Sequence, residues 1–150
     1  MAKPRVLVVD DEADILAAMA AFLKDALGVE VVAADSGAAG LEVMAQGPVD
    51  LIVSDYRMPG MDGLQFLKRA SELQPDAPRI LLTAFPDMQL AINALNHARI
   101  SRFITKPVDP DGLKTVITNL LDTTRRRNLG AQALKRSVQP RPEEVDGPVS

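Results

Sequence analysis

Five polar side chains stand at or just after the ends of short apolar runs, and their types suit phosphoryl chemistry. They are three carboxylates, one hydroxyl and one ammonium: Asp10, Asp11, Asp55, Thr83 and Lys106. If the runs are parallel strands, their carboxyl ends meet at one edge of a sheet, so we expect these side chains to share a site. Carboxylates held close together repel one another unless protons or a cation intervene.

Oxygen ligands without Cys or a His cluster indicate a hard cation. The chain has no Cys and a single His, so the natural ion is Mg²⁺, with Mn²⁺ as a possible substitute. Lys106 suits a phosphate oxygen by charge, and Thr83 suits one by hydrogen bonding. A carboxylate in such a site can attack phosphorus and become an aspartyl phosphate. These residues therefore predict phosphoryl transfer onto an Asp, with the cation neutralising the developing charge.

The elements that must position this site alternate between strand and helix patterns. β-branched and aliphatic runs predict strands at residues 5–9, 29–34, 49–54, 79–83 and 102–105. Amphipathic stretches follow each of them, the clearest being the stripe of Leu113, Ile117 and Leu120. Strict βα alternation predicts an α/β fold, a doubly wound five-stranded parallel sheet with right-handed crossovers.

Local signals place the helix starts and the inward helix faces. Ser36 and Asp62 are expected N-caps, and Asp109-Pro110 is expected to cap the last helix with Pro at its first position. Helical spacing also assigns Ile15 to the buried face of the first helix and Leu73 to that of the third.

Length and charge bound the organisation of the chain. Its 150 residues suit one domain. Residues 1–122 hold 17 of the 20 acidic residues and 11 of the 17 basic ones, which argues against direct nucleic-acid binding. No apolar run approaches a membrane span, and residues 1–5 are unlike the start of a signal peptide, so we expect a cytoplasmic protein without a membrane partner.

The C-terminal 28 residues differ from the rest in charge and composition. We predict a domain at 1–122, followed at 123–150 by a basic helical extension and then a disordered Pro-rich tail. Apolar positions continue into this segment with a heptad spacing that Thr124, Arg127 and Gly130 weaken. Two interpretations stay open: a frayed basic helix end, or a helix that pairs in a homodimer or leads to an output domain.

The order of these motifs resembles the receiver (CheY-like) domain of two-component response regulators. The matching pieces are Asp10-Asp11, the stretch DYRMPGMDG from Asp55 to Gly63, Thr83-Ala84 and Lys106-Pro107. The resemblance covers residues 5 to about 122. It implies a flavodoxin-like (βα)5 fold with strand order 2-1-3-4-5.

The resemblance also implies a role for each site residue. Asp55 would be the phosphoacceptor, and Lys106 would bind a phosphoryl oxygen beside a peptide bond that is commonly cis in the family. Asp11 would bind Mg²⁺ directly and Asp10 mainly through a metal-bound water. Asp55 and the backbone carbonyl of Arg57 would complete the protein's metal ligands. The switch would comprise the Thr83 hydroxyl and an aromatic residue, Phe103.

Partners follow from the same resemblance. The phosphoryl donor would be a sensor histidine kinase, a phosphotransfer protein or a small phosphodonor. The face formed by the fourth helix, fifth strand and fifth helix would contact a downstream protein or an output domain. Residues 94–107 are similar to receivers found ahead of cyclic-dinucleotide phosphodiesterases or other enzymatic output domains. The protein would catalyse its own phosphorylation and dephosphorylation and no other reaction.

Two other functions compete with the receiver hypothesis. One is a scaffold that acts without phosphorylation, against which the complete set of five site residues argues. The other is an aspartyl-phosphate phosphohydrolase of the haloacid-dehalogenase type. Those enzymes resemble an Asp-x-Asp pattern, whereas Arg57 stands two residues after Asp55 here. The sequence therefore favours the phosphorylation switch.

Overall fold

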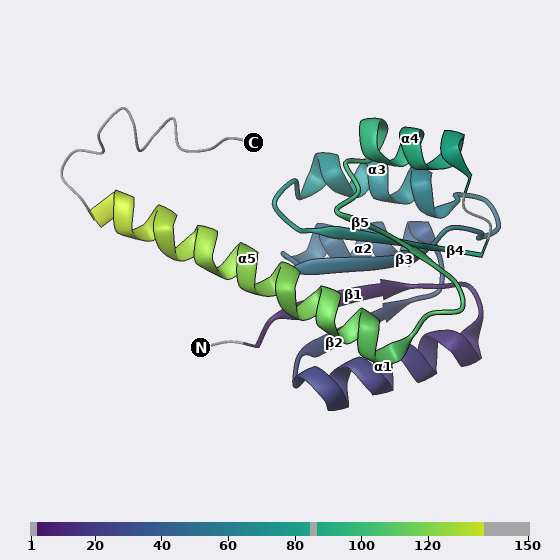
Figure 1. The fold of residues 1–150 in the computed structure, drawn as a ribbon, viewed down its shortest axis with the longest axis horizontal. Coiled ribbons are helices and arrows are strands. Elements are labelled where there is room, and N and C mark those ends of the chain that lie inside the picture. The colour runs from purple at the N-terminus through teal and green to yellow at the C-terminus, as the bar shows by residue number, and fades with distance from the viewer. Residues whose placement is uncertain (1–2, 85–86, 137–150) are drawn as a thin grey trace.

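The computed structural model describes residues 3–84 and 87–136, and one parallel sheet organises that part of the chain (Figure 1). Strands and helices alternate throughout it. In chain order the elements are β1 (Arg5–Val9), α1 (Ala13–Leu27), β2 (Glu30–Ala34), α2 (Gly37–Gln46), β3 (Leu51–Asp55), α3 (Gly63–Leu73), β4 (Arg79–Thr83), α4 (Met88–His97), β5 (Arg102–Thr105) and α5 (Pro110–Arg136).

The sheet has the order β2-β1-β3-β4-β5, and every neighbouring pair is parallel. The predicted α/β doubly wound fold with order 2-1-3-4-5 is confirmed. Register then decides which strand ends meet. Asp55 pairs with Leu82, and Thr83, one residue further along β4, pairs with Thr105. The ends of β1, β3, β4 and β5 therefore lie at one edge of the sheet.

Helices cover both faces of the sheet. α1 and α5 pack on the face to which Val8 and Val53 point, whereas α2, α3 and α4 pack on the face of Val9 and Ile52. Figure 1 shows α5 and α1 on one side of the strands and α3 and α4 on the other. Side chains alternate across a strand. A sheet covered on both faces therefore needs apolar residues at nearly every position, as the near-continuous aliphatic runs supply.

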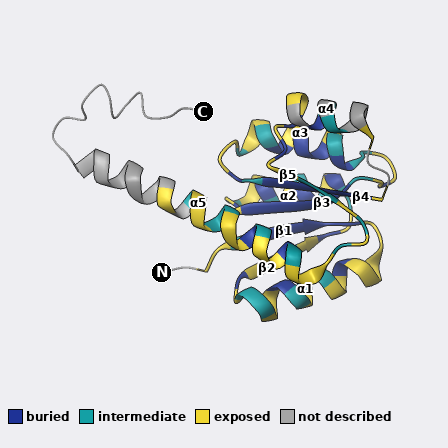
Figure 2. Cartoon of the chain, viewed as in Figure 1, coloured by how far each residue is buried: buried dark blue, intermediate teal, exposed yellow. Residues whose placement is uncertain are grey.

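Two inward-face predictions are wrong. Ile15 is 38% exposed and Leu73 is 56% exposed, whereas Leu16 and Phe66 are buried instead. In α1 the buried stripe includes Leu16, the neighbour of Ile15, and in α3 it contains Phe66, Leu67 and Ala70 and ends before Leu73. Figure 2 shows the exposed outer surface of α1 beside the buried strands.

Side-chain caps fix several helix starts at the site edge of the sheet. The Ser36 hydroxyl accepts a hydrogen bond from the Ala39 amide at 3.1 Å. Asp62 and Gln65 form a reciprocal capping box at the start of α3. At the start of α5, an Asp109 carboxylate oxygen accepts from the Gly112 amide at 3.2 Å. The predicted caps at Ser36 and Asp62 are confirmed.

α5 continues well past the sheet. Its first turns pack on the body through Leu113 and Ile117, both buried, and the helix then projects away from the strands to Arg136 (Figure 1). The predicted Pro-rich tail falls on residues 137–150, outside the described residues. No helix in the described part of the chain has the length and apolar character that crossing a membrane requires.

Candidate functional site

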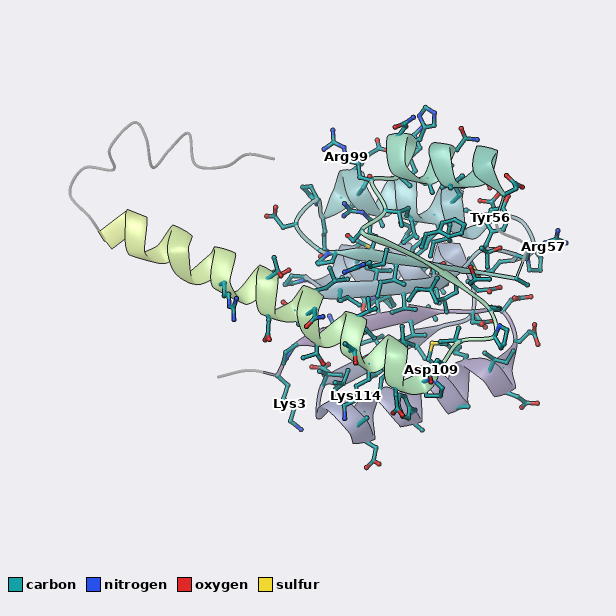
Figure 3. The ribbon with its side chains drawn as sticks, viewed as in Figure 1. Lys3, Tyr56, Arg57, Arg99, Asp109 and Lys114 are labelled. Atoms are coloured by element: carbon teal, nitrogen blue, oxygen red, sulfur yellow. The ribbon has the colours of Figure 1, made fainter. Side chains whose placement is uncertain are left out.

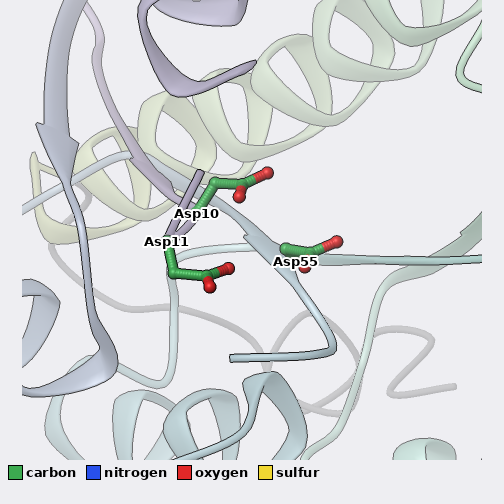
Figure 4. Close-up of side chains that lie close together, drawn as sticks. All are labelled: Asp10, Asp11 and Asp55. Atoms are coloured by element: carbon green, nitrogen blue, oxygen red, sulfur yellow. The ribbon is translucent and has the colours of Figure 1, made fainter. Parts of the chain in front are cut away.

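Three carboxylates meet at the carboxyl edge of the sheet (Figure 4). Asp10 and Asp11 follow β1, and Asp55 is the last residue of β3. Each offers an oxygen within 4.8 Å of the others. Asp10 and Asp55 are buried, whereas Asp11 is exposed. Pairing of β1 with β3 produces this cluster. Val9 pairs with Ser54, so the next residues along the two strands, Asp10 and Asp55, lie side by side.

The Asp10 carboxylate is buried, and only one of its two oxygens has a hydrogen-bond partner among the described residues. One carboxylate oxygen accepts a hydrogen bond from the Glu12 amide at 2.9 Å. Its other oxygen, Oδ2, is buried and has no hydrogen-bond partner among the described residues. Burial raises the pKa of Asp10, and the charges of Asp55 and Asp11 raise it further. The Glu12 amide and the Lys106 charge lower this pKa by less, so the net direction is upward.

Lys106 reaches the cluster from the end of β5. Its Nζ forms an ion pair with Oδ1 of Asp55, and the Lys106 side chain is 25% exposed. Burial lowers the pKa of Lys106, but the hydrogen bond and charge of Asp55, with the charges of Asp10 and Glu12, outweigh burial and raise it overall. The ammonium is therefore fixed in its charged form beside Asp55. The Lys106–Pro107 peptide is cis, as the resemblance implies.

Thr83, Phe103 and Arg57 lie around this cluster. Thr83 is buried at the end of β4, and its carbonyl accepts a hydrogen bond from the Lys106 amide at 2.8 Å. Phe103 lies on β5 opposite Leu81, partly buried against the core of the α2, α3 and α4 face. Arg57 follows β3 in the loop at the same edge (Figure 3). The structure thus places the three acids, Arg57, Thr83 and Lys106 at one edge of the sheet, and Phe103 further back along β5.

Gly63 positions α3 against the end of β3, a role that the sequence pattern alone does not indicate. The Gly63 amide donates to the Tyr56 carbonyl at 2.7 Å, and a Cβ on Gly63 would lie 2.1 Å from the Asp55 carbonyl oxygen. Because real Cβ contacts are much longer, α3 can approach β3 this closely only with glycine here. The sequence signal was the pair Asp62-Gly63, a cap followed by the residue with the smallest side chain.

The cluster fits a hard divalent cation. Its donors are carboxylate oxygens, which suit Mg²⁺, and the unpartnered Asp10 Oδ2 is a buried acceptor that a hydrated ion would satisfy. A cation would also offset the mutual repulsion of three acids. Lys106 supplies one positive charge to this site and leaves the remaining negative charge uncompensated.

Comparison with known proteins identifies relatives of this chain and agrees with the fold. The family model of the response regulator receiver domain matches residues 6–118. The transcriptional regulatory protein GlrR of Escherichia coli (strain K12) is 40% identical over 117 residues, which cover 78% of this chain and 26% of that protein. The DNA-binding transcriptional regulator NtrC of the same strain is 30% identical over 145 residues, or 97% of this chain and 28% of that protein. The chain thus spans little more than a quarter of these relatives.

Solved structures of receiver domains have the same fold as this chain. A CheY-like response regulator receiver domain protein from Methanospirillum hungatei JF-1 superposes with a TM-score of 0.80 at 29% identity, covering 84% of this chain and 99% of that one. The signal receiver domain of an HD domain-containing protein from Pseudomonas fluorescens Pf-5 gives a TM-score of 0.79 at 30% identity, covering 85% and 93%.

Proposed function

This chain belongs to the response regulator receiver domain family, and from that premise we propose that Asp55 accepts a phosphoryl group in a Mg²⁺-dependent reaction that switches a protein-interaction surface. Receiver domains of response regulators are signalling switches. One observation carries the proposal: Asp55 is buried beside both the acidic cluster and the Lys106 ammonium.

Asp55 is the best placed of the three acids to act as the nucleophile. It pairs with Lys106, which a transferred phosphoryl group would also need as a countercharge. Asp10 is held away from that role by its hydrogen bond to the Glu12 amide, and Asp11 is exposed to solvent. An ammonium already bound to an Asp55 oxygen can move to a phosphoryl oxygen with little rearrangement.

Phosphoryl transfer to Asp55 is a nucleophilic displacement at phosphorus. A carboxylate oxygen of Asp55 forms a bond to phosphorus while the bond from phosphorus to the donor's nitrogen or oxygen breaks, and the donor leaves with that electron pair and takes up a proton. Attack by water later releases inorganic phosphate and restores the carboxylate. Lys106 stabilises the charge on the phosphoryl oxygens throughout, because its raised pKa keeps it protonated.

Asp10, Asp11, Asp55 and the backbone carbonyl of Arg57 would hold the Mg²⁺. When bound, the ion would neutralise charge that develops on the phosphoryl oxygens. The chain's own contribution is to gather the acids before the ion arrives, at the cost of burying Asp10 with one unsatisfied oxygen.

The Thr83 hydroxyl and Phe103 would pass the change at Asp55 to the outer surface. Thr83 ends the strand next to β3. Phe103 lies on β5, whose side chains pack against the core on the α4 face of the sheet and on the α5 face. Phosphorylation can favour a second arrangement of this surface only through its differential affinity for the two arrangements. The switched surface would be the face built by α4, β5 and α5.

The donor and the output complete the proposal. A sensor histidine kinase or a phosphotransfer protein would supply the phosphoryl group, and a downstream protein or an output domain would bind the α4-β5-α5 face. Residues 1–122 would form the receiver, with the basic segment beyond them as a connector or a site of dimerisation. Support comes from relatives that are almost four times as long as the part this chain matches.

The experiment is a titration with Mg²⁺ and then beryllofluoride, a phosphoryl mimic that binds a carboxylate. Wild-type protein is compared with Asp55→Asn and with Asp76→Asn, which removes an exposed acid in the loop between α3 and β4. We expect Mg²⁺-dependent binding of beryllofluoride by the wild type and by Asp76→Asn, and none by Asp55→Asn. Equal binding by all three proteins, or by none, would contradict the proposal.

A further inference from the structure

Arg79 is a buried arginine at the edge of the sheet opposite the carboxylates. It is the first residue of β4, the strand that ends at Thr83, and it is 5% exposed. Arginine is seldom buried unless it is paired with an acid. Among the residues that the structure describes, no carboxylate lies within ion-pair distance of this guanidinium.

Backbone carbonyls hold the guanidinium instead. Nη1 donates to the carbonyls of Pro75 at 3.3 Å and Ala77 at 2.7 Å. Nε donates to those of Ala98 and Arg99, both at 3.2 Å, and Nη2 donates to that of Arg99 at 3.1 Å. The first two acceptors follow the end of α3 and the other two follow the end of α4. One side chain therefore caps the carboxyl ends of two neighbouring helices, where a positive charge is favoured.

The turn after α4 depends on this contact. Arg99 has φ 51, and it is the one non-glycine residue with positive φ in the described part of the chain. That conformation is unfavourable for a residue with a side chain. Two hydrogen bonds from Arg79 fix the Arg99 carbonyl, and the backbones of Arg79 and Ser101 also pair. Figure 3 shows Arg99 on the side of the molecule away from Tyr56 and Arg57.

Burial adds to the fixation of this end of α4. Ala94 and Ala98 are fully buried, and their small side chains let the helix lie close to the core. Burial, followed by the charge of Arg99, lowers the pKa of Arg79, which shows that the guanidinium is held against an electrostatic cost.

We propose that Arg79 is a positioning residue for the switch: it fixes the carboxyl end of α4 in both signalling states, so that α4 pivots about that end. This inference rests on the proposed phosphorylation of Asp55. Thr83 and Arg79 are the two ends of one fully buried strand of five residues. A change at Thr83 therefore reaches the start of α4, while Arg79 holds the other end of the same helix against the same strand.

Hydrogen exchange with and without Mg²⁺ and beryllofluoride tests this inference. In the wild type we expect the exchange of residues 87–93 to change on binding, whereas the Ile100 and Ser101 amides change by less than about twofold. In Arg79→Met the change is expected to spread to Ile100 and Ser101, by about tenfold, the factor that loss of a charge-assisted hydrogen bond commonly brings. Arg69→Met, which removes an exposed arginine on α3, is the control and behaves like the wild type.

A second variant covers the case in which Arg79→Met does not fold. Arg79→Lys keeps a positive charge but lacks the planar fork that reaches both helix ends, so it is expected to show the same spread to a smaller extent. General destabilisation would spread the beryllofluoride response to the buried amides of β1 as well, whereas release of the end of α4 would confine the added response to Ile100 and Ser101. A response at Ile100 and Ser101 in the wild type, or an unchanged pattern in both Arg79 variants, would overturn the inference. Absence of any beryllofluoride response in the wild type would instead overturn the proposed function together with it.

Discussion

Asp10 shows how the site is built at the scale of single residues. Its carboxylate is buried, one oxygen has no partner among the described residues, and two further acids lie close to it. A buried acceptor without a partner lowers the free energy of unfolding of the ion-free protein. This arrangement suits a site that binds a cation, because binding of the cation to the folded state raises the free energy of unfolding again.

Replacement of Asp10 tests this cost. Asp10→Asn removes the buried charge, and we expect it to raise the free energy of unfolding of the metal-free protein by about 1–3 kcal/mol at neutral pH. Mg²⁺ at a hundred times its dissociation constant adds roughly 2.7 kcal/mol to a protein that binds it. It should therefore stabilise the wild type much more than the variant. Urea unfolding with and without Mg²⁺ measures both effects.

The pH dependence gives the same prediction a second readout. The pKa of Asp10 is raised in the folded state, so the folded protein holds this proton more tightly than the unfolded chain does. The advantage of Asp10→Asn should be full above the folded pKa, shrink as the pH falls through it, and vanish below the ordinary value of 3.8. Asp11→Asn is the matched control, with a smaller gain because Asp11 is exposed and hydrated. An advantage that grows at acid pH would contradict the account.

Residue types and order predicted which side chains would meet, but not how two of the supporting residues act. The acids and Lys106 were identifiable because they stand at strand ends, and parallel pairing alone brings such ends together. The role of Arg79 was not identifiable from the sequence, because a charged residue at the start of a strand is expected to be exposed. Its hydrogen-bond acceptors are backbone carbonyls in two separate turns. The close approach of Gly63 depends on where α3 lies against β3, which sequence spacing does not define.

At the scale of elements, strands were predicted better than helix faces. The aliphatic runs predicted all five strands nearly to the residue, because a strand buried on both faces tolerates few polar positions. Helix α1 is rich in Ala, so several apolar stripes fit its sequence, and packing selected the one that contains Leu16 rather than Ile15. The choice depends on the sheet beneath the helix, which tertiary contacts define.

The contact between α3 and β3 yields an element-scale prediction. Gly63→Ala would place a Cβ 2.1 Å from the Asp55 carbonyl, so either α3 or the end of β3 must shift. We expect a loss of about 1–3 kcal/mol in the free energy of unfolding, together with weaker Mg²⁺ binding because Asp55 moves. Chemical denaturation and a Mg²⁺ titration measure these effects.

Gly47→Ala is the matched control for that substitution. Its φ of 172 is extended backbone, and the nearest atom to an added Cβ, a guanidinium nitrogen of Arg5, lies at 3.6 Å. Ordinary van der Waals contact predicts a change in stability within about 0.5 kcal/mol and unchanged Mg²⁺ binding. If both alanine variants behaved alike, the close approach of α3 to Asp55 would not be what positions the carboxylate.

At the scale of the whole molecule, the site and the extension are separable in sequence. Every proposed site residue lies between Asp10 and Lys106, whereas α5 continues to Arg136 beyond the last strand. We expect a fragment of residues 1–122 to fold and to bind Mg²⁺ with an affinity within about twofold of the full chain, because the apolar side chains of α5 that the structure describes in the core all lie at or before Leu121. Circular dichroism and calorimetry of the two proteins check this expectation.

Comparison of the same two proteins by sedimentation decides between the two interpretations of the segment after residue 122. A dimer formed by the full chain and not by the fragment would support pairing through the extension, and monomers in both cases would support a frayed helix end. Loss of folding or of Mg²⁺ binding in the fragment would contradict the separation of site and extension. In that case residues beyond 122 would belong to the folded unit.

Intact-mass spectrometry of the full chain, incubated with Mg²⁺ and a small phosphodonor such as acetyl phosphate, tests the central claim most directly. The account predicts that the wild type gains the mass of one phosphoryl group, that chelation of Mg²⁺ abolishes the gain, and that Asp55→Asn gains none while Asp76→Asn gains it normally. A phosphoryl group acquired equally by Asp55→Asn, or acquired without Mg²⁺, would contradict the assignment of Asp55 and its acidic cluster as the phosphorylation site.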